Sequence, residues 1–178
     1  MMTTTLAISD QLAGHLADLP FRLAQHMGVA VAAMAVGAAL ALPMSLLSMR
    51  VKVIQPPLLV LASLILTIPS LALLAFSVPY LGIGFAPTFL ALLLYSLLPI
   101  VRNAITGMEG VDPNLIEAGT GLGMTRWQLI WRVQLPLAVP MILAGVRTAN
   151  VWVVSTATLS TPVGYESLGN YIFTGLQR

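Results

Sequence analysis

The sequence predicts an all-α polytopic membrane protein, and three observations support this fold class. Of the 178 residues, 58% are hydrophobic and only 8% are charged, and the mean hydropathy is +0.93. A soluble domain carries roughly 25% charged residues, so this chain cannot cover a globule with polar side chains. Long apolar stretches recur along the chain, and a polar interlude rich in glycine, EAGTGLGMTRWQLIWRVQLP, separates the last two of them.

Composition also excludes several kinds of site. The chain contains no cysteine, which rules out disulfides and thiolate metal sites. His15 and His26 lie eleven residues apart without clustered carboxylates, so we interpret them as interfacial polar residues and expect no metal site. A net charge of +2 is too small to indicate a nucleic-acid partner.

The N-terminal region divides into a polar segment and a first span. Residues 1–26 mix polar and apolar residues, include Asp10, Asp18 and Arg22, and predict an external segment with a short interfacial helix. Residues 27–48 carry no charge. At 1.5 Å per residue they are long enough for a bilayer core of about 30 Å.

Three further spans follow. The second covers about 56–78 and is broken near its middle by Pro69. The turn PYLGIG leads into a third span at 81–101, whose helix is expected to begin at Phe85, and the fourth covers 137–159. The apolar pieces of the remaining STPVGYESLGNYIFTGLQR are too short to cross.

Basic residues near the span ends predict the orientation. One side collects Arg50, Lys52, Arg102, Arg126 and Arg132, and the other has Arg22 and Arg178. The loop 102–136 is therefore expected in the cytoplasm and the N-terminus outside. Four spans would leave the C-terminus outside, directly after a glycine-rich segment that looks like a lead-in to another helix, so we expect a fifth span that these residues lack.

The interlude and the residues before it predict two short helices. Asp112 is placed to cap the first helix and Pro113 occupies its first position, where a missing N–H has no cost. Gly119, Gly121 and Gly123 are expected to end this helix and turn the chain.

The second helix is expected to begin at a capping box formed by Thr125 and Gln128, and to stop at Pro136. Three apolar residues share one of its faces, which is expected to pack: Trp127, Ile130 and Trp131. Local physics leaves two interpretations open for this pair of helices, a stiff loop on the lipid headgroups or an element that docks a protein.

The interlude resembles the cytoplasmic signature of ABC importer permeases: Glu-Ala-Ala, three residues, Gly, nine residues, Ile-x-Leu-Pro. The residues that match in type and spacing are Glu117, Ala118, Gly123, Leu135 and Pro136. Gly119 replaces the second Ala of the signature, and Val133 replaces the Ile.

From about residue 27 onward, other segments resemble the permease subunits of osmoprotectant importers, which handle glycine betaine, choline and carnitine. They are ILTIPSLALLAF, LGIG, LLPIVRNAITGMEGVDPNLIEAGTGLGMT and GVRTANVWVVSTATLSTPVG. The resemblance implies a type I importer-like helical bundle in a bacterial inner membrane, with residues 27–178 as its permease domain.

The resemblance also implies partners. The loop would dock in a groove of a cytoplasmic ABC ATPase through a coupling helix at 112–124, with Glu117 meeting a basic group and Gly119 allowing close backbone approach. The implied coupling residues are Asp112, Pro113, Glu117, Ala118, Gly119, Gly123 and Met124. The chain lacks a phosphate-binding loop, so ATP would be bound by the partner and no cofactor by this chain. A second permease subunit, identical or homologous, and an external solute-binding protein complete the expected assembly.

Arg147 is the one charge inside a predicted span, and such charges usually face a bundle interior or a wet cavity. Arg147, Thr148, Ser155 and Thr158 fall within roughly a 100° arc of the fourth helix, with Asn150 beside it. Trp152 could bind a quaternary ammonium by cation–π contact, and the kink at Pro69 could also line the solute path. The alternative is a structural network in which these residues bond across helices.

The leading hypothesis is a transport subunit, not an enzyme, because no span carries a carboxylate pair, a His–Glu cluster or a Ser–His arrangement. An importer permease for another small solute, such as an amino acid, is the first alternative, since the loop signature is shared among ABC importers. A non-transport membrane scaffold is the second.

Overall fold

A computed structural model describes the backbone of residues 2–176 and the side chains from residue 13 onward; Arg178 lies outside the described residues. Within 2–176 the regular structure is helical and contains no strand, which confirms the predicted all-α class. The helices are α1 Met2–Arg50, α2 Gln55–Thr67, α3 Ser70–Leu81, α4 Phe85–Glu109, α5 Pro113–Gly121, α6 Arg126–Leu129, α7 Leu135–Thr158 and α8 Gly169–Leu176. Short turns of other helix types lie between them: η1 Lys52–Ile54, η2 Ile130–Gln134 and η3 Thr161–Val163.

Within the described residues, three helices are long and apolar enough to cross a membrane: Ala13–Arg50, Phe85–Glu109 and Arg126–Thr158. The pair formed by η1–α2 and α3 adds a fourth span if it is counted as one broken crossing. This arrangement confirms a multi-pass protein with three to four apolar spans.

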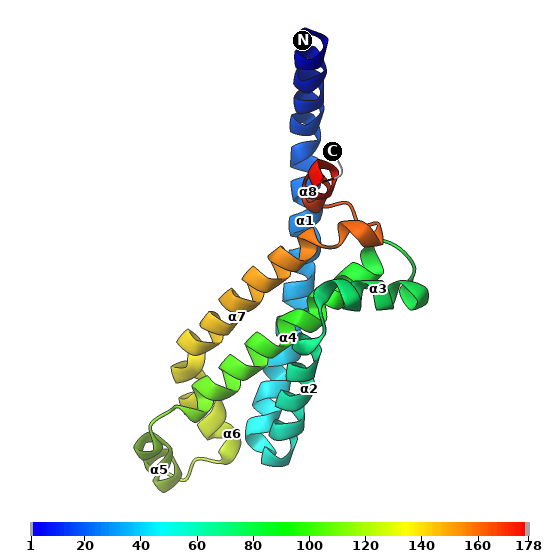
Figure 1. Ribbon diagram of the computed structural model, residues 1–178. Coiled ribbons are helices and arrows are strands. Elements are labelled where there is room, and N and C mark those ends of the chain that lie inside the picture. The colour runs from blue at the N-terminus through cyan, green and yellow to red at the C-terminus, as the bar shows by residue number, and fades with distance from the viewer. Residues whose placement is uncertain (1, 177–178) are drawn as a thin grey trace.

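The N-terminal segment differs from the expected short interfacial helix. It is continuous with the first span, so α1 has 49 residues and is about 73 Å long, far more than a 30 Å bilayer core requires. Figure 1 shows its first turns projecting beyond the other helices, with α8 lying beside the turns that follow.

Contacts from the C-terminal region support this long helix. Arg22 pairs with Glu166 at 2.6 Å, and the Tyr165 hydroxyl donates to the carbonyl of Gln25 at 2.9 Å. Tyr171 donates to the carbonyl of His15 at 3.1 Å. These partners lie 140 to 156 residues away in sequence, which is why sequence periodicity alone could not reveal them.

The break at Pro69 was predicted, but its size was not. The axes of the two helices that flank it differ by 95°, so α2 and α3 do not form a merely kinked span. Pro69 cannot donate a backbone hydrogen bond, and Ile68 before it adopts an extended backbone. The Tyr95 hydroxyl donates to the carbonyl of Ile68, which satisfies a backbone group that the break leaves free.

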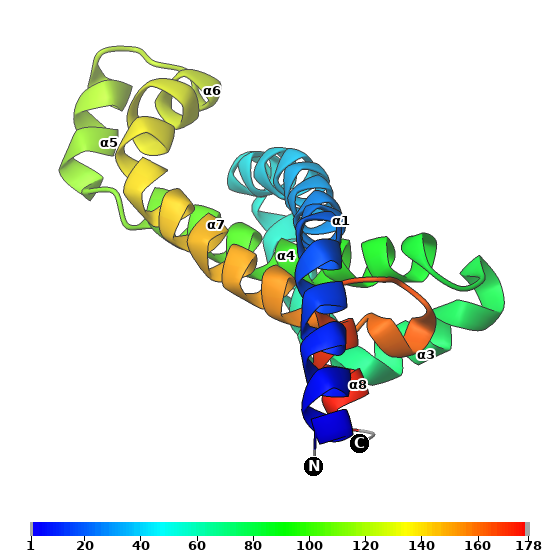
Figure 2. The same cartoon turned by 90° about the horizontal axis from the view of Figure 1, so that it is seen from above.

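The core lies where α1, α4 and α7 pack together, as Figure 2 shows from above. Small side chains let these helices approach closely. A Cβ at Gly145 of α7 would lie 2.6 Å from the Asn103 Cβ and 2.7 Å from the Pro99 carbonyl oxygen of α4. Glycine is therefore required for this spacing of α4 and α7.

Helix α4 continues eight residues beyond the predicted end of the third span, to Glu109. Arg102 consequently lies within a candidate span, two turns from its end. The candidate helices also include charged residues nearer their ends, such as Asp18, Arg22 and Arg132, so Arg147 is not the single charge in such a helix. Beyond α4, the pair α5–α6 lies at the end of the molecule opposite both termini (Figure 1).

Candidate functional site

The loop between α4 and α7 forms the first candidate site, and its starting residues behave as predicted. Asp112 caps α5: its side-chain Oδ1 accepts from the backbone N–H of Asn114 at 2.9 Å. Pro113 is the first residue of the helix. The cap is followed by a nine-residue helix that ends at Gly121.

A tight turn then leads into α6. Gly123 has a φ of +79°, in the left-handed region that glycine adopts without strain. The predicted capping box is present: the Thr125 N–H donates to the Gln128 side chain at 2.7 Å, and the Gln128 N–H donates to the Thr125 hydroxyl at 3.4 Å. The two predicted helices, broken around Gly123, are confirmed.

Pro136 does not stop the second helix, contrary to the sequence-based expectation. From Arg126 to Thr158 the chain stays helical through the π-helical turn η2, in which the Leu135 N–H donates to the carbonyl of Ile130. A proline ring clashes with the carbonyl four residues earlier, and a wider turn relieves that crowding. The second short helix is therefore a continuous helical extension of α7.

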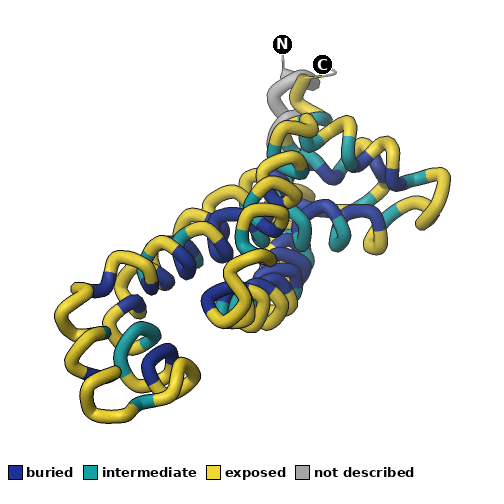
Figure 3. The backbone as a smooth tube through the Cα atoms, turned by 90° about the horizontal axis from the view of Figure 1, so that it is seen from below, coloured by how far each residue is buried: buried dark blue, intermediate teal, exposed yellow. Residues whose placement is uncertain are grey.

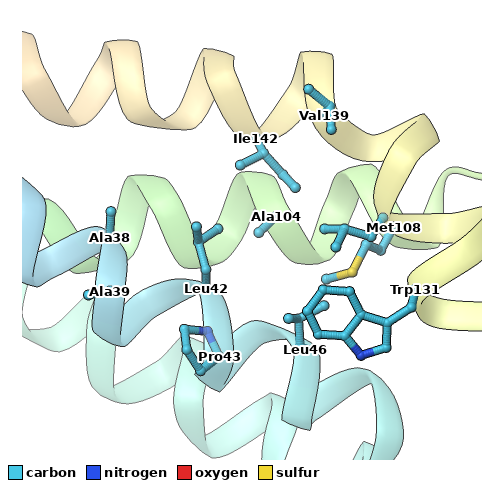
Figure 4. A pocket seen from close by; sticks show the side chains of 11 residues that line it. Ala38, Ala39, Leu42, Pro43, Leu46, Ala104, Met108, Trp131, Val139 and Ile142 are labelled. Atoms are coloured by element: carbon cyan, nitrogen blue, oxygen red, sulfur yellow. The ribbon is translucent and has the colours of Figure 1, made fainter. Parts of the chain in front are cut away.

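Of the three residues expected on the packing face of α6 and η2, Ile130 is buried as predicted, but the two tryptophans are not. Leu129 and Ile130 are buried, whereas Trp127 and Trp131 remain 42% and 55% exposed. Trp131 lines an apolar hollow of about 520 Å³ between α1, α4 and α7, where it lies near Leu46 (Figure 4). The tryptophans thus occupy the rim of the bundle and not its interior.

The expected coupling residues divide between two faces of α5 and the turn behind it. Asp112, Pro113, Glu117 and Ala118 are exposed, whereas Gly119 is buried. A Cβ at Gly119 would lie 2.6 Å from the Leu129 Cδ2 and 3.3 Å from the Met124 sulfur. The close approach expected at Gly119 is therefore made by this chain's own α6. Gly123 is exposed, and Met124 is half-buried.

Polar contacts hold this loop against the rest of the chain. The Gln134 side chain donates to the carbonyl of Met108 at 3.2 Å and joins η2 to the end of α4. The Lys52 ammonium lies 2.7 Å from the Glu109 carboxylate, which also accepts from Gln55 at 3.0 Å. A hollow of about 410 Å³ lies between these residues and the helices α5 and α6. Sequence reasoning missed the Lys52–Glu109 pair, because 57 residues separate its members.

The second candidate site is a stripe on α7. Arg147, Thr148, Asn150, Trp152 and Ser155 are exposed, and Thr158 is half-buried. The opposite face of α7 packs into the core through small residues. Figure 3 shows buried and exposed faces along the long helices. The exposure of the stripe residues places them on the side of α7 that does not pack into the core.

Two hollows flank Arg147. One, of about 580 Å³, lies between α1 and α7 and includes Asn150; the other, of about 470 Å³, includes Thr148 and Trp152. The Thr148 hydroxyl donates to its own helix, at the carbonyl of Ala144, over 3.0 Å. Pro69 is not part of this cluster, since it lies at the α2–α3 break, which packs on α4.

Comparison with known proteins assigns the sequence to one family. Residues 20–178 match the family described as binding-protein-dependent transport system inner membrane component. The carnitine transport permease protein OpuCB of Listeria monocytogenes is 44% identical over 152 residues, which are 85% of this chain and 70% of that protein.

Two Bacillus subtilis proteins are similar to this chain to the same extent as each other. The glycine betaine/carnitine/choline transport system permease protein OpuCB and the choline transport system permease protein OpuBB are each 41% identical over 159 residues, 89% of this chain and 73% of theirs. Among solved structures, an inward-facing MetNI methionine ABC transporter superposes with a TM-score of 0.75 at 18% identity, covering 88% of this chain and 79% of that one. The latter similarity shows the type I importer fold.

Proposed function

From the premise that this chain belongs to the family of binding-protein-dependent transport system inner membrane components, we propose that it is the permease through which an ATP-driven importer moves small osmoprotectants. Permease subunits of this family work with an ATPase and a substrate-binding protein. The relatives at 41–44% identity are permeases named for carnitine, choline and glycine betaine. Their names are the basis for the solute class proposed here.

The observation that carries the mechanism is the exposed, capped helix α5 at one end of the bundle. Its outward residues, Glu117 among them, are exposed, whereas its buried Gly119 packs on α6. The helix α6 continues into α7 without a break. A movement of α5, which packs on α6, is therefore transmitted to α7. We assign to α5 the docking of a cytoplasmic ATPase, and to Glu117 a contact with a basic group of that partner.

The stripe on α7 is the proposed lining of the solute path. An arginine near the middle of a membrane helix is costly unless it faces water or a partner. The exposed side of α7 would therefore face an aqueous path, enclosed by a second permease subunit, and not lipid. Pro69 stands apart from this lining: it is exposed at the α2–α3 break, where the neighbouring Ile68 carbonyl accepts from the Tyr95 hydroxyl.

The proposed orientation follows from the distribution of basic residues, with the α5–α6 end in the cytoplasm and α1 beginning outside an inner membrane. The chain has no cysteine, so a single Gly14→Cys variant can report this directly. A Cβ at Gly14 has no neighbour within 4 Å. We expect an impermeant maleimide to label it from outside in intact cells; labelling only after the inner side is opened would reverse the orientation.

Uptake measurements test the proposed function. A host that lacks its own osmoprotectant importers should take up labelled glycine betaine, carnitine or choline when this permease is expressed with its ATPase and external binding protein. A panel of amino acids, methionine included, serves as the control. Uptake confined to an amino acid would assign a different solute, and uptake of none by an assembled complex would contradict transport.

A further inference from the structure

Three polar side chains share one face of α1 near the end of the bundle that carries both termini. Arg22, Gln25 and His26 occupy positions i, i+3 and i+4, so they lie on the same side of the helix. Among the side chains that the structure describes, their Nη1, Oε1 and Nδ1 atoms are the buried ones that make no hydrogen bond. His26 is only 1% exposed, and its ring contacts the backbone of Val154 in α7. Buried polar groups are normally paired, so this polar face of α1 requires an explanation.

The segment 160–176, which we call the strap, lies against this polar face. Its Glu166 carboxylate lies 2.6 Å from the Arg22 Nη1 atom, without the geometry of a hydrogen bond. The Tyr165 hydroxyl donates to the backbone carbonyl of Gln25 at 2.9 Å. The last helix of the strap, α8, lies beside α1 (Figure 1). The strap therefore contacts the polar face of α1 but leaves polar side-chain atoms of that face unsatisfied.

The strap holds the other helices by different contacts. Its Val163 carbonyl accepts from the Gly84 N–H, between α3 and α4, at 2.8 Å, and Val163 is buried in an apolar cluster that includes Ala91 of α4. The Ser167 hydroxyl of the strap donates to the carbonyl of Ala157 in α7 at 3.1 Å. On this side the strap thus has a buried apolar anchor. Its polar contacts with α1 instead come from side chains, and the side chain of Glu166 is 55% exposed.

The free energy of the contact between the strap and α1 is close to balanced. A buried polar atom without a partner costs about as much free energy as a hydrogen bond contributes, and a partly exposed ion pair adds little. Separation of the strap from α1 breaks the Tyr165 hydrogen bond, but it allows water to reach the unpaired atoms of Gln25 and His26. Separation of the strap from α3 and α4 would instead expose the apolar cluster around Val163. The contact with α1 is therefore the one that the strap can release at small cost.

We propose that the strap is a latch, which is closed on α1 in this structure and releases the polar face of α1 when α7 moves in the transport cycle. The latch rests on the proposed function, in which a movement of α5 is transmitted to α7. Because Ser167 ties the strap to α7, a displacement of α7 relative to α1 draws Glu166 and Tyr165 away from their partners. Water then hydrates the polar face of α1, which offsets the contacts that are lost.

Cysteine labelling measures this release, and the chain has no native cysteine that would interfere. His26→Cys is labelled with a maleimide in the complete transporter in lipid nanodiscs, where the reagent reaches both faces. Labelling should be slow in the resting complex and about tenfold faster or more when ATP and vanadate trap the ATPase, because the rate follows the open fraction. Ala91→Cys is the matched control: it is also buried, but it lies where the strap stays packed, so its labelling should stay slow in both states. Gln25→Cys, on the same polar face, takes the place of His26→Cys if the latter does not assemble.

The ion pair of the latch is tested in the same His26→Cys background. Glu166→Gln and Arg22→Gln should each raise the resting labelling rate about two- to fivefold, and the double variant should raise it no further, because the two side chains act as one pair. Equal labelling of position 26 in the two states, faster labelling of position 91 instead, or additive effects of the two substitutions would overturn the latch. If the complex still takes up solute in any of these cases, the latch fails and the proposed function stands, whereas an assembled complex that takes up no solute contradicts the function itself.

Discussion

Replacement of Asp112 by alanine tests whether α5 is held in shape by its cap. The helix has nine residues, too few to be stable alone in water, and only Gly119 on it is buried. Its order therefore depends on the α6 contact and on the 2.9 Å hydrogen bond from the Asn114 N–H to the Asp112 side chain. Loss of such a cap costs about 1 kcal/mol, which corresponds to about a fivefold lower ratio of ordered to frayed α5.

Amide hydrogen exchange over residues 113–121 is the appropriate assay, because the protection of these amides follows that ratio directly. Asp112→Ala should exchange about fivefold faster there and at the wild-type rate in α4, with reduced solute-stimulated ATP hydrolysis. Asp112→Asn retains a capping oxygen without the charge and should behave like the wild type. Wild-type exchange in Asp112→Ala would refute the role of the cap, and equal defects in both variants would assign the effect to the charge.

Three further variants test other parts of the account. Gly145→Ala should cost about 1–3 kcal/mol of unfolding free energy through overpacking and so lower the melting temperature of the purified protein, because its Cβ would lie 2.7 Å from the Pro99 carbonyl. Gly28→Ala is the control and should leave the melting temperature unchanged, because a Cβ there has no neighbour within 4 Å. Glu117→Lys should reach the membrane but lose ATPase binding and uptake, at a cost of about 2–5 kcal/mol; an unchanged ATPase pull-down would remove this residue from the interface. Tyr165→Phe removes a hydrogen bond to α1 and should cost about 1 kcal/mol of unfolding free energy, and no loss would show that the contact is unimportant.

Local signals in the sequence were sufficient for much of the candidate site. The Asp112 cap, the Thr125–Gln128 box and the turn at Gly123 each depend on residues within four positions of one another. Apolar length and composition were likewise sufficient to place the apolar parts of α1, α4 and α7, but not the ends of these helices. These features follow from local backbone hydrogen bonds and from the removal of apolar side chains from water. Both can be inferred from residues that are close together in the sequence.

Features that depend on distant residues were not predictable. The continuity of α1 reflects contacts from Tyr165 and its neighbours, and the 95° bend at Pro69 is accommodated by Tyr95. The continuation of α6 into α7 through Pro136 depends on a π-helical turn. A proline after a short helix is typical of a helix end. Only the tertiary packing decides whether the helix ends there or continues through a π-helical turn.

Photocrosslinking from α5 tests whether this helix docks the ATPase. A benzoyl-phenylalanine at position 117 projects from the exposed face of α5, and one at position 80, where the native tyrosine is 75% exposed beyond the α2–α3 bend, serves as the control. In membranes that contain the assembled importer, we expect an adduct between position 117 and the ATPase subunit and none from position 80. An ATPase adduct from position 80 but not from 117, in a complex that still hydrolyses ATP on solute addition, would contradict it.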